Sequence, residues 1–378
     1  MLVVTYCSKI KFMTYIKYNP IDPFFKSVVG AVAEDMPFGV RLQINQIVNP
    51  SSVTMRVYDD NGSFTCDYPM HRDESGNGFD NYVAELSLKK GLYRYYFVMD
   101  GVTYEHFIGM GENRRPSLFY DNVRPYQLSV YKKIYQTPTW LNKGVMYQIF
   151  VDRFCASGKV VPNEDKIMRN WGEQPYFRDE DGVVLNRDFF GGDLEGVISR
   201  LPYLRSLNVS TIYLNPIFKA YSNHKYDTED YETIDPMFGT QQDFERLCAE
   251  AHNLGIHVIL DGVFNHVGSS SKYFNREGKY GDQGAYRDPK SPYRDWFNFR
   301  PDGSYECWWN FRTLPRINAR SKSAQKYFTD KNGIVRRWIA RGASGWRLDV
   351  VDEIDDCMLD KIVAAAKKEN PQAAIATV

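Results

Sequence analysis

The sequence predicts an α/β fold: a partial (β/α)8 TIM barrel of strands one to about five, with an inserted domain, preceded by an N-terminal antiparallel β-sandwich. Apolar and polar residues alternate with period two up to about residue 130, and strand and helix patterns alternate from residue 144. Polar residues follow successive strands of this second part, where such barrels place their sites. We therefore expect a sandwich over 1–130, a linker over 131–143 and a barrel over 144–378, with the insertion at about 267–320.

The first part contains short alternating runs that are bounded by turn residues, a pattern typical of half-buried antiparallel strands. The pair Asp100-Gly101 predicts a hairpin. The polar cluster at 73–78 is expected to be a solvated loop. The expected strands cover 40–47, 52–58, 82–88, 91–99, 102–108 and 127–131.

The second part alternates between apolar strands and amphipathic helices, which at this length predicts a parallel sheet covered by helices. Gly255 follows one periodic segment and is the residue type expected just after a helix. The expected strands cover 145–154, 209–218, 256–264, about 345–349 and 373–378. The expected helices cover 194–207, 241–254, 324–341 and 357–368.

Composition narrows the class of ligand and the compartment. Lys plus Arg and Asp plus Glu number 47 each, so no net field favours nucleic acid or an anionic membrane. No apolar run approaches the length of a transmembrane helix. The six cysteines are scattered without a CxxC pair, which predicts free thiols and a cytoplasmic protein. Small neutral ligands fit this balance best.

The segment around Arg347 and Asp349 is the first candidate for chemistry. On a strand these two side chains point to the same face, and a cation beside a carboxylate favours its ionised form. These two residues alone fit a nucleophile and a buried structural salt bridge equally well. Polar residues end the other strands too, at 152–153, 215 and 261–266. Each of these polar residues alone fits a helix cap or a loop hydrogen bond. Together they are expected to lie at one edge of the predicted sheet.

Several segments resemble the α-amylase superfamily (glycoside hydrolase family 13) of retaining α-glucan hydrolases and transglycosidases, in particular its neopullulanase, cyclomaltodextrinase and maltogenic amylase branch. The matching signatures are Asp261-Gly-Val-Phe-Asn-His266, Gly345-Trp-Arg-Leu-Asp349 and Leu314-Pro-Arg-Ile-Asn318, the last similar to one in the branch's inserted B domain. Supporting matches lie at 144–154, 189–194, 224–231 and 235–239. The resemblance covers about 143–378, and the expected sandwich is similar in layout to the branch's N-terminal sugar-binding-type domain.

The resemblance implies that Asp349 is the nucleophile, which forms a covalent glycosyl-enzyme, and that Arg347 holds it ionised and oriented. Asp261 and His266 would contact the glucose ring or brace Arg347, and Tyr226 would stack on that ring. An aromatic face suits an oxocarbenium-like centre. The implied substrates are cyclodextrins, pullulan or maltooligosaccharides.

Four further residues have roles that the resemblance implies. Asn265 and Glu353 complete the expected substrate-binding set, although Glu353 also fits the acidic start of the last helix. Gly191 and Asp193 match positions that bind calcium in some relatives, yet the preceding loop at 156–166 lacks the acidic pattern. A loop cap is therefore favoured for Asp193, and no cofactor is expected for the chemistry itself.

A retaining mechanism needs a second carboxyl group about 5 Å from the nucleophile. In the family this group is a Glu at the end of the fifth strand, and the strand expected at 373–378 is the last in this sequence. We therefore expect a fragment that is inactive alone. The resemblance to the branch also implies a homodimer for the full-length parent. The alternatives are a carbohydrate-binding protein without turnover and a nonfunctional gene fragment.

Overall fold

The computed structural model describes residues 15–377 except 102–105, 134–135, 143, 161–165, 177, 179–183 and 185. The chain forms two compact units, Met1–Gln136 and Thr137–Val378. Parts of the expected strand at 102–108 and of the loop at 156–166, and residue 378, lie outside the described residues. None of the described helices is both long and apolar enough to cross a membrane.

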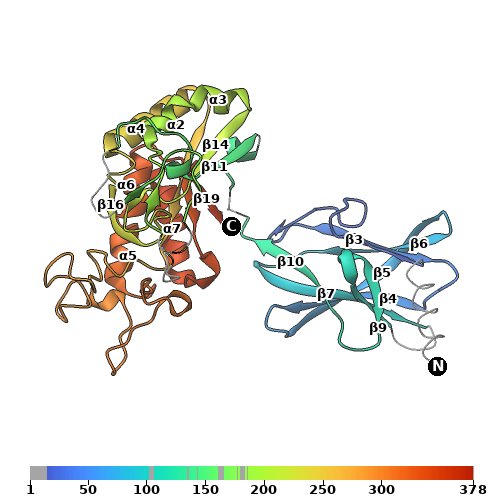
Figure 1. The fold of residues 1–378 in the computed structure, drawn as a ribbon. Helices are drawn as coiled ribbons and strands as arrows, with labels where there is room; N and C mark the ends of the chain where they lie inside the picture. The colour runs from blue at the N-terminus through green and yellow to red at the C-terminus, as the bar shows by residue number, and fades with distance from the viewer. Residues whose placement is uncertain are drawn as a thin grey trace. The chain divides into compact units, whose positions relative to one another are not determined.

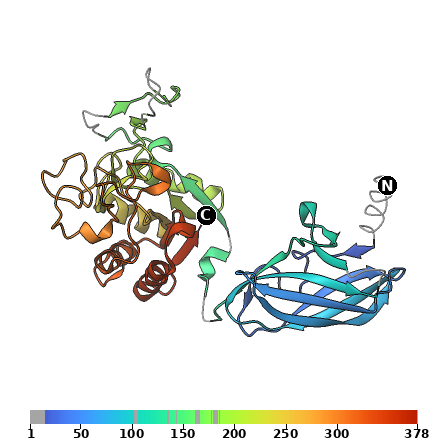
Figure 2. The same cartoon turned by 90° about the horizontal axis from the view of Figure 1, so that it is seen from below.

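The first unit is a largely antiparallel sheet, whose strands lie alongside one another in Figure 2. Buried residues of β3, β4 and β7 belong to one hydrophobic cluster, as their alternating sequences require. Its strand order is β1-β3-β6-β5-β4-β7-β10-β2, with β8 beside β7 and β9 beside β8. The strands are β1 (Ile16–Lys17), β2 (Val32–Ala33), β3 (Phe38–Asn45), β4 (Ser52–Asp59), β5 (Phe64–Gly76), β6 (Phe79–Leu86), β7 (Gly91–Asp100), β8 (His106–Met110), β9 (Pro116–Phe119) and β10 (Tyr126–Tyr131). A short 3-10 helix, η1 (Glu112–Arg114), lies before β9.

Strand β5 corrects the loop that was expected at 73–78. Residues 73–76 end this strand, and Asn77 and Gly78, at φ 51° and 76°, form the two-residue turn into β6. Such a turn requires positive φ at both positions, which Asn-Gly provides. Apolar residues alternate in the first half of β5, at Phe64, Cys66, Tyr68 and Met70, but residues 71–76 are all exposed, so no apolar pattern extends the strand into 73–76.

The second unit contains a curled five-stranded parallel sheet in sequence order (Figure 1). In its register Asp261 pairs with Arg347, which brings the ends of two strands together. A Cβ on Gly345 would lie 2.1 Å from the carbonyl oxygen of Ala374, so β18 and β19 need glycine at this position to approach. The strands are β11 (Val145–Ile149), β14 (Val209–Leu214), β17 (His257–Gly262), β18 (Gly345–Leu348) and β19 (Ala374–Thr377).

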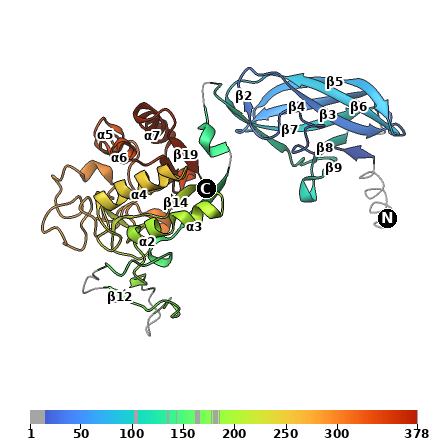
Figure 3. The ribbon, with the colours of Figure 1, turned by 90° about the horizontal axis from the view of Figure 1, so that it is seen from above.

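Helices pack around this sheet, with α2 beside α4 and α6 beside α7 (Figure 3). Two helices that were expected to be continuous are each broken in two. The helix expected at 194–207 breaks at Arg200, because Pro202 has no N–H to continue the ladder. That expected at 324–341 breaks before Gly333, which follows a turn at Asp330. The helices are α2 (Leu194–Ser199), α3 (Leu201–Ser206), α4 (Gln241–Asn253), α5 (Lys322–Thr329), α6 (Ile334–Ala340) and α7 (Asp356–Glu369).

The strand expected at 209–218 is also divided. The strand β14 ends at Leu214, and after Pro216 the chain enters β15 (Phe218–Ala220), which pairs with β16 (Thr228–Ile234) in a separate antiparallel hairpin. The loop of this hairpin carries Tyr226. The remaining short elements are β12 (Ile167–Met168), β13 (Asp188–Phe189), η2 (Thr139–Asn142), η3 (Val151–Arg153), η4 (Arg294–Trp296), η5 (Trp308–Asn310) and η6 (Val351–Glu353).

Candidate active site

The carboxyl ends of β17 and β18 bring two carboxylates to one guanidinium group. Arg347 Nη1 donates to Asp349 Oδ1 at 2.7 Å and to Asp261 Oδ1 at 3.1 Å. Asp261 is fully buried, and the side chains of Arg347 and Asp349 are 14% and 12% exposed. A buried cation shared by two carboxylates lowers the cost of keeping both without water.

Asp261 is the centre of a hydrogen-bonded network that links three strand ends. The hydroxyl groups of Tyr213 and Tyr226 both donate to its Oδ2, the second at 3.1 Å. Asn215 Nδ2 in turn donates to the hydroxyl oxygen of Tyr226 at 3.1 Å. Burial raises the pKa of Asp261 to about 6, the charge of Asp349 adds to this effect, and Tyr213 and Arg347 oppose it.

Asp349 is oriented by Arg347 but keeps one oxygen free. No described residue donates to its Oδ2, and the side chain lines the cavity described below. Burial raises the pKa of Asp349, and the hydrogen bond and charge of Arg347 lower it only in part. Arg347 thus counteracts desolvation instead of outweighing it. Val350, next in the chain, has φ 49°, a strained conformation for a β-branched residue, and turns the chain directly after Asp349.

A cavity of about 560 Å³ opens over Asp349, and its wall is partly aromatic. The Trp308 ring stacks on His266 with 5.3 Å between ring centroids, and Phe311 stacks on Trp308. Tyr226 lines the same cavity. Flat apolar faces beside a few polar groups are typical of small-ligand sites.

His266 presents an unpartnered donor to this region. Asn265 Nδ2 lies 3.4 Å from His266 Nδ1 and donates to it, which leaves the ring proton on Nε2. Nε2 is buried without a hydrogen-bond partner among the described residues. Burial lowers the pKa of His266 to about 4, so the ring is neutral at pH 7. A neutral N–H donor suits an uncharged hydroxyl group.

His224 lies on the same wall and is fixed in the same tautomer. Its Nδ1 accepts from the backbone N–H of Tyr226 at 3.1 Å, which places the proton on Nε2. Burial lowers the pKa of His224 from its ordinary value. The cavity therefore has two neutral imidazole rings.

Glu353 lies apart from this group. Its Oε1 accepts from Trp309 Nε1 at 2.7 Å, and its carbonyl oxygen accepts from Arg316. With Asn265 it lines a second cavity, of about 370 Å³. The structure thus brings Arg347, Asp349, Tyr226 and His266 to one place, braced by Asp261, and Glu353 to another.

Gly191 and Asp193, the calcium candidates, have the contacts of a loop cap. Asp193 Oδ1 accepts from Gly196 N at 2.7 Å, which caps α2, and its Oδ2 accepts from the Ser157 hydroxyl. The backbone N–H of Gly191 donates to Asp152 Oδ1, and Gly191 itself has φ 81°. Among the described residues no group of three His, Cys, Asp or Glu could hold a metal ion. The described contacts of Asp193 are those of a loop cap, and structural calcium stays a prediction.

Sequence reasoning missed several site residues. Tyr213 precedes Asn215 by two positions on one strand, so both point to the same face, a signal that could have found it. Trp308 precedes the Leu314 to Asn318 signature, and only the fold of the insertion brings it to His266.

Polar groups and an aromatic cavity at the carboxyl edge of a curled parallel sheet are typical of the barrel class of enzyme folds, which place their sites at this edge. The chain belongs to the α-amylase family, because the family model for the α-amylase catalytic domain matches residues 148–375.

Relatives within this family confirm the resemblance to the cyclomaltodextrinase and neopullulanase branch. An amylopullulanase from Thermoanaerobacterium saccharolyticum is 38% identical, over 90% of this chain and 30% of the relative. A cyclomaltodextrinase from Thermoanaerobacter pseudethanolicus is 35% identical, over 81% of this chain and 52% of the relative. A solved cyclomaltodextrinase structure has a TM-score of 0.60 at 26% identity, covering 97% of this chain and 60% of that one. The chain therefore spans less than two thirds of each of these relatives.

Proposed function

We propose that the protein cleaves or transfers α-glucosidic bonds of cyclodextrins, pullulan or maltooligosaccharides with retention of configuration, with Asp349 as the nucleophile. The bonds are α-1,4, with α-1,6 bonds as a second class. The observation that carries this proposal is the Arg347 bridge, which fixes Asp349 through Oδ1, while Asp349 lines the cavity and no described residue donates to its Oδ2. Cyclomaltodextrinase and neopullulanase are the names of relatives that support the substrate class.

In the proposed step, an oxygen of Asp349 bonds to the anomeric carbon while the bond from that carbon to the glycosidic oxygen breaks. The leaving oxygen takes a proton from a general acid, and water later hydrolyses the glycosyl ester. His266 Nε2 and His224 Nε2 would donate to sugar hydroxyl groups, and Tyr226 would hold the ring.

The general acid is the component that the described residues of the cavity do not supply. The carboxylates among the described lining residues are Asp349 and Asp227. Asp227 accepts from the backbone N–H of Ser222 at 3.1 Å and from the Ser222 hydroxyl group, so it holds the loop. We infer that the 378 residues alone bind α-glucans without turning them over.

The same observation favours a second candidate function, carbohydrate binding without catalysis. Titration calorimetry with β-cyclodextrin and maltotriose, together with an assay for released reducing sugar, tests both candidates. Binding without release supports the inferred inactivity, and formation of a covalent sugar adduct on Asp349 separates the hydrolase from a protein that only binds. Release by the purified chain would contradict the inferred inactivity, and the absence of binding would overturn both candidates. A Tyr226→Ala variant, with its cavity wall removed, is the control for binding at this site.

We also propose a cytoplasmic location and a homodimer. Five described cysteines are free: Cys66, Cys155, Cys248, Cys307 and Cys357. One relative, 40% identical over 245 residues, is an intracellular maltogenic amylase from Bacillus subtilis. Cell fractionation tests the location, and light scattering tests the dimer.

A further inference from the structure

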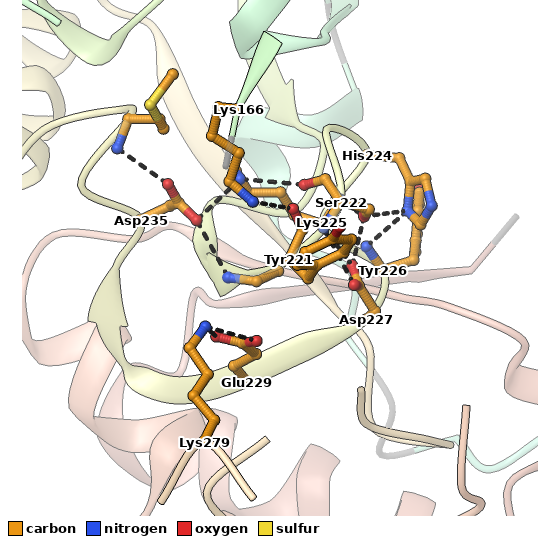
Figure 4. A network of polar contacts seen from close by, with 12 residues as sticks. Lys166, Tyr221, Ser222, His224, Lys225, Tyr226, Asp227, Glu229, Asp235 and Lys279 are labelled. Atoms are coloured by element: carbon orange, nitrogen blue, oxygen red, sulfur yellow. Dashed lines mark hydrogen bonds and ion pairs between the residues drawn. The ribbon is translucent and has the colours of Figure 1, made fainter. Parts of the chain in front are cut away.

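Lys225 is a buried cation within the loop that forms one wall of the cavity. Its neighbours His224 and Tyr226 both line the cavity, whereas Lys225 is fully buried. Figure 4 shows this loop with the dashed contact from Lys225 to Asp235. A buried lysine is rare unless it is paired, so its role needs an explanation.

The partner of Lys225 is held firmly by the β15–β16 hairpin. Lys225 Nζ lies 2.8 Å from Asp235 Oδ2, and this carboxylate also accepts from Ala220 N and Met237 N at 3.1 and 2.9 Å. The ammonium group lies 4.9 Å from the ring centroids of both Phe189 and Phe238. Nζ also donates to the carbonyl oxygen of Ser222, within the loop, at 3.2 Å. The side chain thus has one defined position, which is set by Asp235 outside the loop and by Ser222 inside it.

The backbone of Lys225 is left-handed, with φ 60°. This conformation is unfavourable for a residue with a side chain and persists where surrounding contacts impose it. The Ser222 hydroxyl oxygen accepts from Lys225 N at 2.9 Å and closes the turn. The turn sends Lys225 into the core, while the residues on either side line the cavity.

We propose that Lys225 is a positioning residue, whose ion pair with Asp235 imposes the left-handed turn that places His224 and Tyr226 on the cavity wall. Its part in sugar recognition rests on the proposed function, but its part in fixing the loop does not. A purely structural ion pair would stabilise the unit without affecting this wall.

The test compares Lys225→Met and Asp235→Asn with Lys279→Met. Asp235→Asn keeps the size of the residue and the bond from Met237, so it serves if Lys225→Met does not fold. Lys279 pairs at 2.7 Å with Glu229, which is buried on the same hairpin, and its variant is the matched control. The rate of hydrogen exchange in a peptide spanning 221–228 measures the stability of the turn in the absence of sugar. Calorimetry measures the affinity of the cavity for β-cyclodextrin.

We expect both pair variants to exchange faster within 221–228 and to bind β-cyclodextrin at least about tenfold more weakly. Lys279→Met should leave both readings at the wild-type value. Unchanged exchange in both pair variants would overturn the proposal. Faster exchange with unchanged affinity would reduce the pair to a loop brace and overturn its positioning part. A wild-type protein that binds no glucan would refute the proposed function, and exchange alone would then decide the role of the turn.

Discussion

Arg347 Nη1 lies 2.7 Å from Asp349 Oδ1, two residues further along the chain, and the same nitrogen lies 3.1 Å from Asp261 Oδ1. One nitrogen therefore serves two carboxylates from adjacent strands. This arrangement orients Asp349 through Oδ1, and no described residue donates to its Oδ2. Apart from Asp227, which holds the loop, the other described side chains that line the cavity are uncharged, which suits an uncharged sugar.

Replacing Arg347 with Met should destabilise the second unit by about 3–5 kcal/mol, because two buried carboxylates lose their cation. The free energy of unfolding from urea titration measures this loss. Arg336, which pairs with Glu369 at 2.8 Å on α6 and α7, provides the control Arg336→Met. The control should also lower stability but leave β-cyclodextrin affinity unchanged. Equal sugar affinity in Arg347→Met and wild type would contradict the role given to Arg347.

His266 should make stability fall in acid. Its pKa is about 4 in the folded state, below the ordinary value of 6.5, so the unfolded state binds the proton first as pH falls. This contribution to stability is complete above pH 6.5 and is lost as pH falls from 6.5 to 4, and the loss at pH 4.5 is about 2–3 kcal/mol.

Comparison with a His266→Asn variant isolates this effect. Asp261, whose pKa is raised to about 6, works in the opposite direction, since its stability is present at low pH and lost as pH rises through 6. Asp261 is present in both proteins, so it largely cancels in the difference. Urea titrations near pH 7.5 and pH 4.5 should show that the difference in unfolding free energy between wild type and His266→Asn narrows by about 2–3 kcal/mol at the lower pH. A gap independent of pH would contradict a buried neutral His266.

Asp193→Ala should cost about 1–2 kcal/mol, because Gly196 N and the Ser157 hydroxyl lose their acceptor. Thermal melts of wild type with calcium chloride or with EDTA should coincide. A melting temperature that calcium raises in the wild type but not in the Asp193→Ala variant would show that the residue is a metal ligand instead of a cap.

The parallel sheet was predictable because each of its strands is an apolar run that ends in polar residues. The α4 helix was predictable for a similar reason, since its apolar stripe stops at Gly255, which has φ 70°. The local pattern also predicted that the side chains of Arg347 and Asp349 lie side by side, since residues two apart on a strand share a face.

The rest depends on contacts that no local pattern encodes. The end of strand β5, residues 71–76, is wholly exposed and carries no apolar alternation. Lys225 looks like a solvated charge in sequence, and only its pairing with Asp235 makes it a core residue. Trp308 reaches His266 through an insertion with little regular structure. In each case tertiary contacts override the local signal.

Trapping a covalent sugar on Asp349 tests the central claim most directly. With α-maltosyl fluoride, an Asp349 oxygen bonds to the anomeric carbon and fluoride leaves with the electron pair, so no general acid is needed. Without a base to activate water, the ester should accumulate. Intact-mass spectrometry should show one maltosyl group on the wild-type chain, mapped by peptide analysis to Asp349 and absent from Asp349→Asn. A wild-type chain that binds maltotriose but gains no adduct, or an equal adduct on Asp349→Asn, would contradict the account.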